Sequence, residues 1–364
     1  MKVQKIKLQN SIQPHWIVIG DDYLPIEPIG QYLYYLYSIK KSPYTIRTYA
    51  HHLKIYWEYL IAKKLNWKEI NTNTIANFIA TMSGLVDGNI IHLALEQSKR
   101  SERTINQIII AVSSFYQYHL GLNNVEEIAF YSWKKPFYTS QSYKPLLHHL
   151  SKSKNQRHSI FKLREKKNLC KVIDPTTIKM MVAACKRVRD KFLICLLYET
   201  GCRIGQVLGL RHADIETFNN IIKIFPRNDN ANFARSKSCD ENIIHVSDGL
   251  MQLYCDYFMQ EYGEVESDYV FINLWEGEIG KPISYSSVIT LFQRLSKKLG
   301  THVTPHMLRH THATELIKAG WGMAHVQQRL GHRNIQTTIN TYVHLSNDDL
   351  KEKYKAYLMA KEEN

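Results

Sequence analysis

The chain has 364 residues, of which 44% are hydrophobic and 22% charged, a balance typical of a folded globular protein and not of a disordered one. This length allows two domains and a sizeable core. The formal net charge of +14 favours nucleic acid as a partner, although a basic surface can also serve solubility alone.

The cysteines and the hydropathy pattern both argue against a secreted or membrane protein. The 6 cysteines form no C-x-x-C pair and lie mostly within apolar helical patterns, which indicates buried, reduced thiols rather than disulfides. The first twenty residues lack the long apolar core of a signal peptide, and no apolar run approaches the roughly 20 residues that span a bilayer. We therefore expect a soluble, cytoplasmic protein with no membrane partner.

Residues 1–26 are expected to form an N-terminal arm or hairpin. Two short runs of strand-forming residues, 3–8 and 16–19, are separated by the polar segment 10–14, which favours a β-hairpin.

Residues 27–133 are expected to form a helical domain. Apolar side chains recur at three- and four-residue spacing in several stretches, which is typical of amphipathic helices packed around a core. Ser42 stands where it can cap one helix, and residues 104–120 predict another of about the same length.

Residues 134–172 form a strongly basic segment that is expected to link two domains. It contains eleven lysines and arginines but a single acid, Glu165. Two interpretations stay open: a solvated linker, or a linker that contacts phosphates along a nucleic acid. For the second, the candidate DNA-binding residues are Lys134, Lys135, Lys152, Lys154, Arg157, Lys166 and Lys167.

Residues 173–364 are expected to form a second, mostly helical domain with a small antiparallel sheet. Asp174 and Pro175 begin a helix over 175–185, and further helices are predicted over 188–200, 248–262 and 285–299. Strands are predicted over 214–218, 221–225 and 243–246, the first two joined by a turn at Asn219 and Asn220.

The stretch 304–344 holds the densest group of candidate functional residues. Thr304 can cap a helix whose first residue is Pro305, so that His306, Arg309 and His310 share its first turns. Basic side chains there oppose the helix dipole, an arrangement easier to understand if an anion binds. Gly331 ends the next helix, followed by His332 and, ten residues later, by Tyr342.

A metal site is the competing interpretation of these histidines. His302, His306 and His310 recur every four residues, which is metal-ligand spacing on a helix. Pro305 makes a helical His302 improbable, however, and the intervening Arg309 would repel a cation. We therefore expect no metal and no cofactor.

In chain order, these residues resemble the catalytic signature of the tyrosine recombinases, the phage integrase family. The first match is Thr200 to Gln206, where Arg203 follows a helix-ending glycine and Gln206 replaces the family's usual glutamate. Residues 42–53 and 101–116 are similar to the signature helices of the family's core-binding domain. There, Gln107, Ser113 and Gln117 occupy positions that are often basic. The matched catalytic positions are Arg203, Lys237, His306, Arg309, His332 and Tyr342.

The resemblance implies a mainly α fold in which a helical, SAM-like core-binding domain and a catalytic domain form a C-shaped clamp on double-stranded DNA. It also implies site-specific strand cutting and rejoining through a 3′-phosphotyrosine, without metal or ATP. Tyr342 would be the nucleophile, and Arg203 and Arg309 would clamp the phosphate. Lys237 would protonate the leaving 5′ oxygen, with Lys223 and Arg235 as nearby competitors.

The two remaining histidines also receive roles from the resemblance. His306 would bind the phosphate or take the tyrosine proton, and His332 would donate to a phosphate oxygen. Members of the family act as homo-tetramers on paired sites, often exchanging a C-terminal helix, for which residues 348–364 are available. Element-encoded accessory proteins are further possible partners of this bacterial-type, DNA-associated enzyme.

Within the family, the basic linker and N-terminal arm are more similar to mobile-element integrases, and to the transposase A type of site-specific transposons, than to compact chromosome-dimer resolvases. Integration, excision and transposition are thus the expected activities. The alternatives are a catalytically idle DNA-binding relative and a metal-dependent nuclease.

Overall fold

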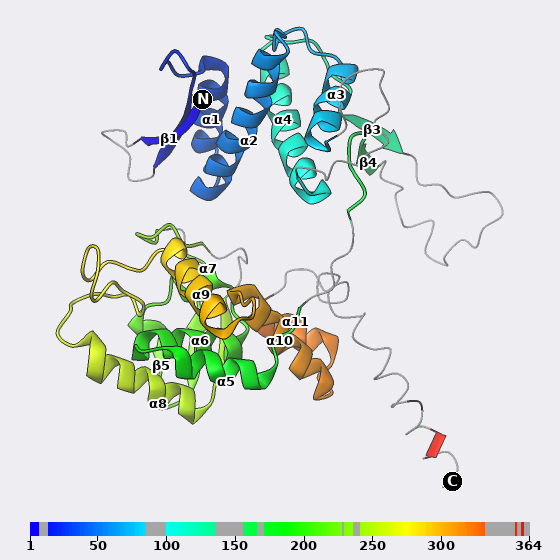
Figure 1. Ribbon diagram of the computed structural model, residues 1–364. Helices are drawn as coiled ribbons and strands as arrows, with labels where there is room; N and C mark the ends of the chain where they lie inside the picture. The colour runs from blue at the N-terminus through cyan, green and yellow to red at the C-terminus, as the bar shows by residue number, and fades with distance from the viewer. Residues whose placement is uncertain are drawn as a thin grey trace. The chain divides into compact units, whose positions relative to one another are not determined.

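The computed structural model describes residues 1–6, 14–84, 100–134, 156–165, 171–227, 229–235 and 241–331, together with 354, 358 and 359 (Figure 1). The chain divides into two compact units, Met1–Lys167 and Asn168–Asn364. Each unit has a hydrophobic core of its own.

The first unit begins with the predicted hairpin. Strands β1 (Lys2–Ile6) and β2 (His15–Ile19) pair antiparallel, with Lys2 opposite Ile19. Val18 is buried in the core of the first unit, so the hairpin is packed onto the helices that follow it. These two paired strands lie within the range 1–26 for which an arm or hairpin is expected.

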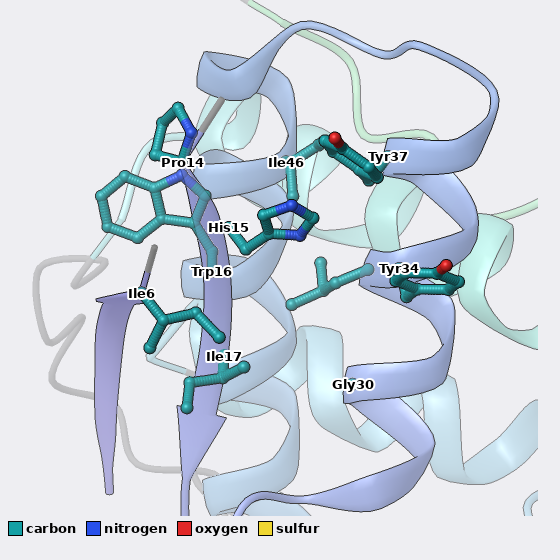
Figure 2. A pocket seen from close by; sticks show the side chains of 10 residues that line it. Ile6, Pro14, His15, Trp16, Ile17, Gly30, Tyr34, Tyr37 and Ile46 are labelled. Atoms are coloured by element: carbon teal, nitrogen blue, oxygen red, sulfur yellow. The ribbon is translucent and has the colours of Figure 1, made fainter. Parts of the chain in front are cut away.

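A small pocket lies between this hairpin and the first two helices (Figure 2). Its volume is about 190 Å³, and the Arg47 guanidinium lies 5.3 Å from the ring centre of Trp16 at its wall. The lining residues are Ile6, Pro14, His15, Trp16, Ile17, Gly30, Leu33, Tyr34, Tyr37 and Ile46. None of the predicted catalytic residues is among them.

Four helices form the body of the first unit: α1 (Glu27–Ser38), α2 (Pro43–Ala62), α3 (Thr72–Met82) and α4 (Glu102–Gly121). Asn71 and Ser101 cap α3 and α4 by accepting the backbone N–H groups of Thr74 and Thr104. The core is rich in aromatic rings, and the hydroxyls of Tyr56 and Tyr116 are 2.8 Å apart within it. The prediction of a helical domain is confirmed.

Part of the basic segment after α4 is folded against this unit. Strands β3 (Tyr131–Lys134) and β4 (Gln156–Ser159) pair antiparallel, a pairing that the sequence did not predict. The Asn106 side chain, on α4, accepts the N–H of Leu163 at 2.8 Å and donates to the Leu163 carbonyl and the Glu165 carboxylate at 3.0 and 2.9 Å. These hydrogen bonds therefore hold the segment after β4 against α4.

The second unit is built on α5 (Pro175–Ala184), α6 (Val188–Thr200), α7 (Ile204–Val207), α8 (Asp248–Tyr257), α9 (Tyr285–Leu299), α10 (Pro305–Lys318) and α11 (Met323–Leu330). α6 is almost entirely enclosed, and Phe192, Leu193 and Leu197 are fully buried on it. The helix predicted over 248–262 changes to π-helical geometry over Phe258–Tyr262.

A three-stranded antiparallel sheet, in the order β5-β6-β7, completes the second unit. Its strands are β5 (Ile215–Glu216), β6 (Ile221–Ile224) and β7 (Asn242–His245). The strand predicted over 214–218 is wrong at both ends, because Asp214 closes a 3-10 turn (His212–Asp214) and Thr217 lies in the following turn. Asp214 is 1% exposed, and its carboxylate accepts a forked pair of bonds from Arg227 at 2.6 and 2.7 Å.

Among the described residues, no helix is long and apolar enough to cross a membrane.

Candidate active site

Helix α10 begins as the sequence predicts and places Arg309 on its second turn. Thr304 is the N-cap and Pro305 the first helical residue, and the Thr304 hydroxyl accepts the N–H of Met307 at 3.3 Å. His306, Arg309 and His310 therefore occupy neighbouring positions of the helix, as their spacing indicates.

Arg309 is buried in the second unit, with an exposed fraction of only 2%. Its Nη1 donates to the carbonyl oxygen of Gly201 at 2.6 Å, and its Nη2 donates to the carbonyl oxygen of Leu330 at 2.9 Å. The guanidinium thus joins the ends of α6 and α11 to α10. A planar fork with five donors can make such bonds and still bind an anion.

Arg203 approaches the same turn from another direction. It is the N-cap of α7 and is partly buried, and its Nη1 donates to the carbonyl oxygen of Gly331 at 3.3 Å. Burial lowers the pKa of Arg203 below its usual range. Since Leu330 and Gly331 are adjacent, the structure brings the two predicted arginines together at one turn.

The Gln206 side chain supports Arg203 by binding the backbone N–H of Arg203. The Gln206 amide oxygen accepts the N–H of Arg203 at 2.9 Å, and the side chain is buried. The neutral amide of Gln206 therefore accepts the hydrogen bond that a glutamate carboxylate could accept, without adding a negative charge. This geometry gives a physical role to the replacement noted in the sequence.

The loop between α6 and Arg203 depends on Gly201. This residue ends α6 in the left-handed conformation, with φ 61°. A Cβ atom there would lie 2.7 Å from Cδ2 of His312 and 2.8 Å from Cδ2 of Leu330. Glycine is thus required both for the backbone angle and for the close approach of α10 and α11.

His306 and His310 pack against each other at the start of α10. Their ring centres are 4.4 Å apart, and His306 is exposed while His310 is half-buried. Burial, helped by the neighbouring His306 and Arg309, lowers the pKa of His310 to about 4. His310 is therefore neutral near pH 7.

The metal interpretation finds no support in the described part of the chain. His302 precedes the N-cap Thr304 and so does not share a helical face with His306 and His310. In the ranges that the structure describes, no three His, Cys, Asp or Glu side chains are grouped so that they could hold an ion.

Several predicted site residues lie outside the described ranges. These are Lys237, His332 and Tyr342, and the linker residues Lys135, Lys152, Lys154, Lys166 and Lys167. Lys134 and Arg157 belong to β3 and β4, where Lys134 is opposite Gln156 and Arg157 is opposite Trp133.

Arg329 is a residue of this site that the sequence analysis missed. Its Nε donates to Nε2 of His312 at 3.0 Å, and its Nη2 donates to the carbonyl oxygens of Glu199 and His245, each at 3.1 Å. Burial, followed by the charges of Arg329 and Arg309, lowers the pKa of His312 to about 3. The available signal was the position of Arg329 directly before Leu330 and Gly331.

The arrangement concentrates positive charge where backbone carbonyls of three segments converge. Arg203, Arg309 and Arg329 all lie close enough to the buried Cys202 thiol to interact with it electrostatically. Guanidinium groups that converge in this way match the non-bridging oxygens of a phosphodiester. The geometry is thus suited to binding a phosphate and to neutralising charge that develops on it.

Two family models match the chain and together cover both units. The phage integrase family matches residues 171–348, and the phage integrase N-terminal SAM-like domain matches residues 29–120. Among curated proteins, transposase A from transposon Tn554 of Staphylococcus aureus is 42% identical over 363 residues, covering 100% of this chain and 99% of the relative. Tyrosine recombinase XerA of Saccharolobus solfataricus is 34% identical over 198 residues, covering 54% of this chain and 60% of that protein.

Solved structures show the same fold at low sequence identity. The integrase of transposon Tn1549 in complex with a circular intermediate DNA has a TM-score of 0.57 at 17% identity, covering 90% of this chain and 99% of that one. XerH recombinase in a post-cleavage complex with its difH substrate has a TM-score of 0.57 at 18% identity, covering 86% and 79%. The two matched domains and the full-length relative show that this chain belongs to the phage integrase family of tyrosine recombinases.

Proposed function

We propose that this chain is the site-specific DNA recombinase of a mobile element and moves that element by cutting and rejoining DNA strands. The observation that carries the proposal is the convergence of Arg203 and Arg309 on the adjacent carbonyls of Leu330 and Gly331, directly before His332. Similarity to a transposon's transposase over the full length supports the mobile-element role.

In the proposed reaction, the Tyr342 hydroxyl attacks the scissile phosphorus and forms a 3′-phosphotyrosine. The bond from phosphorus to the 5′ oxygen breaks, and Lys237 supplies the proton that this oxygen needs as it leaves. His306 accepts the tyrosine proton or binds the phosphate, and His332 donates to a phosphate oxygen. Because the phosphodiester energy is kept in the covalent link, a second 5′-OH can reverse the step without ATP.

The two arginines are proposed to act on the transition state. Negative charge grows on the non-bridging oxygens as the fifth bond to phosphorus forms, and a rigid guanidinium pair stabilises that charge without reorganising. The hydrogen bonds of Arg309 to Gly201 and Leu330 hold its plane before DNA arrives. Preorganisation of this kind is the reason for burying a charged side chain at the site.

DNA contacts outside the catalytic centre are proposed for the basic segment. Lys134, Lys135, Lys152, Lys154, Arg157, Lys166 and Lys167 would contact phosphates, and each contact would add to the salt dependence of the affinity. A tetramer on paired sites is proposed, with residues 348–364 exchanged between subunits and with accessory proteins of the element as further partners.

Trapping the covalent intermediate tests the proposal. The chain is incubated in EDTA with fragmented DNA of the organism that encodes it, stopped with SDS, and the attached fragments are sequenced. We expect adducts at one recurring site with the natural chain and none with Tyr342→Phe. Tight DNA binding without any adduct would instead favour the idle relative, and cleavage that EDTA abolishes would favour a nuclease.

A further inference from the structure

Arg329 lies on the last turn of α11 and joins that helix to two others. Its Nε donates to Nε2 of His312, on α10, at 3.0 Å. Its Nη2 donates to the carbonyl oxygen of Glu199, on the last turn of α6, at 3.1 Å. The His312 ring is buried and Arg329 is partly buried. One guanidinium thus connects α10, α6 and α11.

Arg309 joins the same three helices by a second set of bonds. It belongs to α10 and donates to the carbonyl oxygens of Gly201 and Leu330. Gly201 is the C-cap of α6, two residues after Glu199, and Leu330 directly follows Arg329 on α11. The two guanidiniums therefore bridge the helix ends at neighbouring positions, and the bonds of one restrain the acceptors of the other.

The His312 ring also contacts the loop that leads to Arg203. A Cβ atom at Gly201 would lie 2.7 Å from Cδ2 of His312, so the ring lies directly against this glycine. Arg203 follows Gly201 by two residues, and its Nη1 donates to the Gly331 carbonyl. A shift of the His312 ring therefore reaches the Gly201 acceptor of Arg309 and the loop that carries Arg203.

The bond between Arg329 and His312 has a single chemical form. A guanidinium can only donate, so Nε2 of His312 carries a lone pair and the neutral ring has its proton on Nδ1. Burial, followed by the charges of Arg329 and Arg309, lowers the pKa of His312 to about 3, so the ring remains an acceptor at neutral pH. A buried network whose members are all satisfied is rigid. Because the ring is neutral, it holds the guanidinium without cancelling its charge.

We propose that the Arg329–His312 bond is a positioning device for strand cleavage, which holds the ends of α6 and α11 so that the arginine pair meets the scissile phosphate as one unit. The inference rests on the proposed function, because it takes Arg203 and Arg309 as the groups that neutralise charge on the non-bridging oxygens. Arg329 and His312 do not touch the reacting atoms. When their bond is lost, the pair is no longer preorganised, and stabilisation of the transition state falls.

The test compares two DNA duplexes that carry the cleavage site recovered by covalent trapping. In one, the scissile phosphate is natural; in the other, a methyl group replaces one non-bridging oxygen and gives a neutral methylphosphonate. The methylphosphonate develops less negative charge in the transition state and so depends less on the arginine pair. For His312→Phe we expect single-turnover cleavage of the phosphate to fall about 100-fold, as for a misplaced catalytic group, and cleavage of the methylphosphonate to fall less than about threefold.

Matched variants separate this role from a general loss of structure. His312→Gln places an amide oxygen near the position of Nε2 and should keep cleavage of the phosphate within about threefold of the natural chain. Asn242→Ala removes a different bond of Arg329, in which the Asn242 side chain of β7 donates to the Arg329 carbonyl at 3.0 Å. Since this bond joins α11 to a strand and not to α6 or α10, we expect both substrates to stay within about threefold. A phosphate-selective loss in Asn242→Ala would overturn the inference.

A second variant covers the case in which His312→Phe does not fold, as judged by its binding to the uncut duplex. Arg329→Lys keeps the positive charge, but an ammonium donates from one atom and cannot reproduce the fork that reaches His312 and the Glu199 carbonyl. We expect the same phosphate-selective loss in Arg329→Lys. Equal losses on both substrates would contradict the positioning role.

A variant of the arginine pair distinguishes this inference from the function on which it rests. If the methylphosphonate does not relieve the loss in Arg203→Ala, the pair does not neutralise charge on the phosphate, and that part of the proposed function falls together with the inference. If it relieves Arg203→Ala but His312→Phe loses both substrates equally, or loses neither, only the positioning role is overturned.

Discussion

The guanidinium of Arg309 donates to the carbonyl oxygen of Gly201 at 2.6 Å. This bond joins the start of α10 to the C-cap residue of α6. Arg203 lies two residues beyond Gly201, so this bond fixes the loop from which the second arginine extends. The same guanidinium bonds the Leu330 carbonyl, directly before the Gly331 carbonyl that receives Arg203. The arginine pair is thus held as one rigid group before any DNA is bound.

The close packing around Gly201 predicts a large effect of a single methyl group. Gly201→Ala must adopt φ 61° and also displace the His312 ring and the Leu330 side chain, so we expect a loss of about 3 kcal/mol in the free energy of unfolding. Gly300→Ala is the control, since its φ is 65° but no atom lies within 4 Å of the added Cβ, and it should lose only about 1 kcal/mol. Urea unfolding measures both. Equal losses would show that the contact with His312 and Leu330 is unimportant.

The ion pair of Asp214 and Arg227 is expected to contribute more to stability than the more exposed pair beside it. Asp214→Asn replaces the carboxylate that accepts both arginine donors, and we expect a loss of about 3 kcal/mol because a partly buried charge is left unpaired. Glu216→Gln, in the neighbouring and more exposed pair with Lys223, should lose much less, because solvent screens an exposed ion pair. Chemical denaturation of the two variants checks the ranking, and a reversed order would contradict it.

The lowered pKa values of His310 and His312 on α10 predict that acid destabilises the second unit. The folded-state pKa is lowered to about 3 for His312 and about 4 for His310 from a usual value of 6.5, so below pH 6.5 the unfolded chain binds more protons than the folded one. The contribution of the neutral histidines to the free energy of unfolding is therefore complete above pH 6.5. It decreases as the pH is lowered toward 4, by up to about 1.4 kcal/mol per pH unit for each histidine.

Urea titrations between pH 7.5 and 4.5 measure this slope, and His312→Phe should make it shallower because one of the two proton-binding sites is gone. A slope that is unchanged in His312→Phe would mean that His312 is not held neutral by the fold.

The hydrogen bonds of Asn106 are expected to hold the segment after β4 against α4. Asn106→Ala removes the bonds to both backbone groups of Leu163 and to Glu165, so hydrogen exchange at the Leu163 amide should accelerate by at least about tenfold. Gln107→Ala, an exposed position on the same helix, serves as the control and should leave the exchange rate unchanged. Protection of Leu163 that persists in Asn106→Ala would show that the apolar contacts of Phe161 and Leu163 hold the segment alone.

Much of the helical fold could be predicted because its signals are local. The cap at Thr304 and Pro305 and the left-handed glycines 201 and 331 mark the starts and ends that the structure has. Apolar periodicity likewise identifies the core faces of α2 and α4.

The pairings that the sequence did not predict are non-local. β3 and β4 join Trp133 to Arg157, which lie far apart in the sequence, and β4, with the sequence QRHS, has no alternation of apolar and polar residues. The Arg329–His312 and Arg227–Asp214 bonds join polar residues whose partners cannot be identified until the backbone brings them together. The arginine pair could be named in advance only because a family resemblance supplied the pairing.

Mass spectrometry of the trapped adduct can identify Tyr342 as the residue that becomes linked to DNA. After nuclease digestion, trypsin releases the peptide 334–351, in which Tyr342 is the single tyrosine. We predict a nucleotide remnant on this peptide in the natural chain and in Tyr354→Phe, and none in Tyr342→Phe. An unmodified 334–351 peptide together with a nucleotide on any other tyrosine would show that Tyr342 is not the nucleophile.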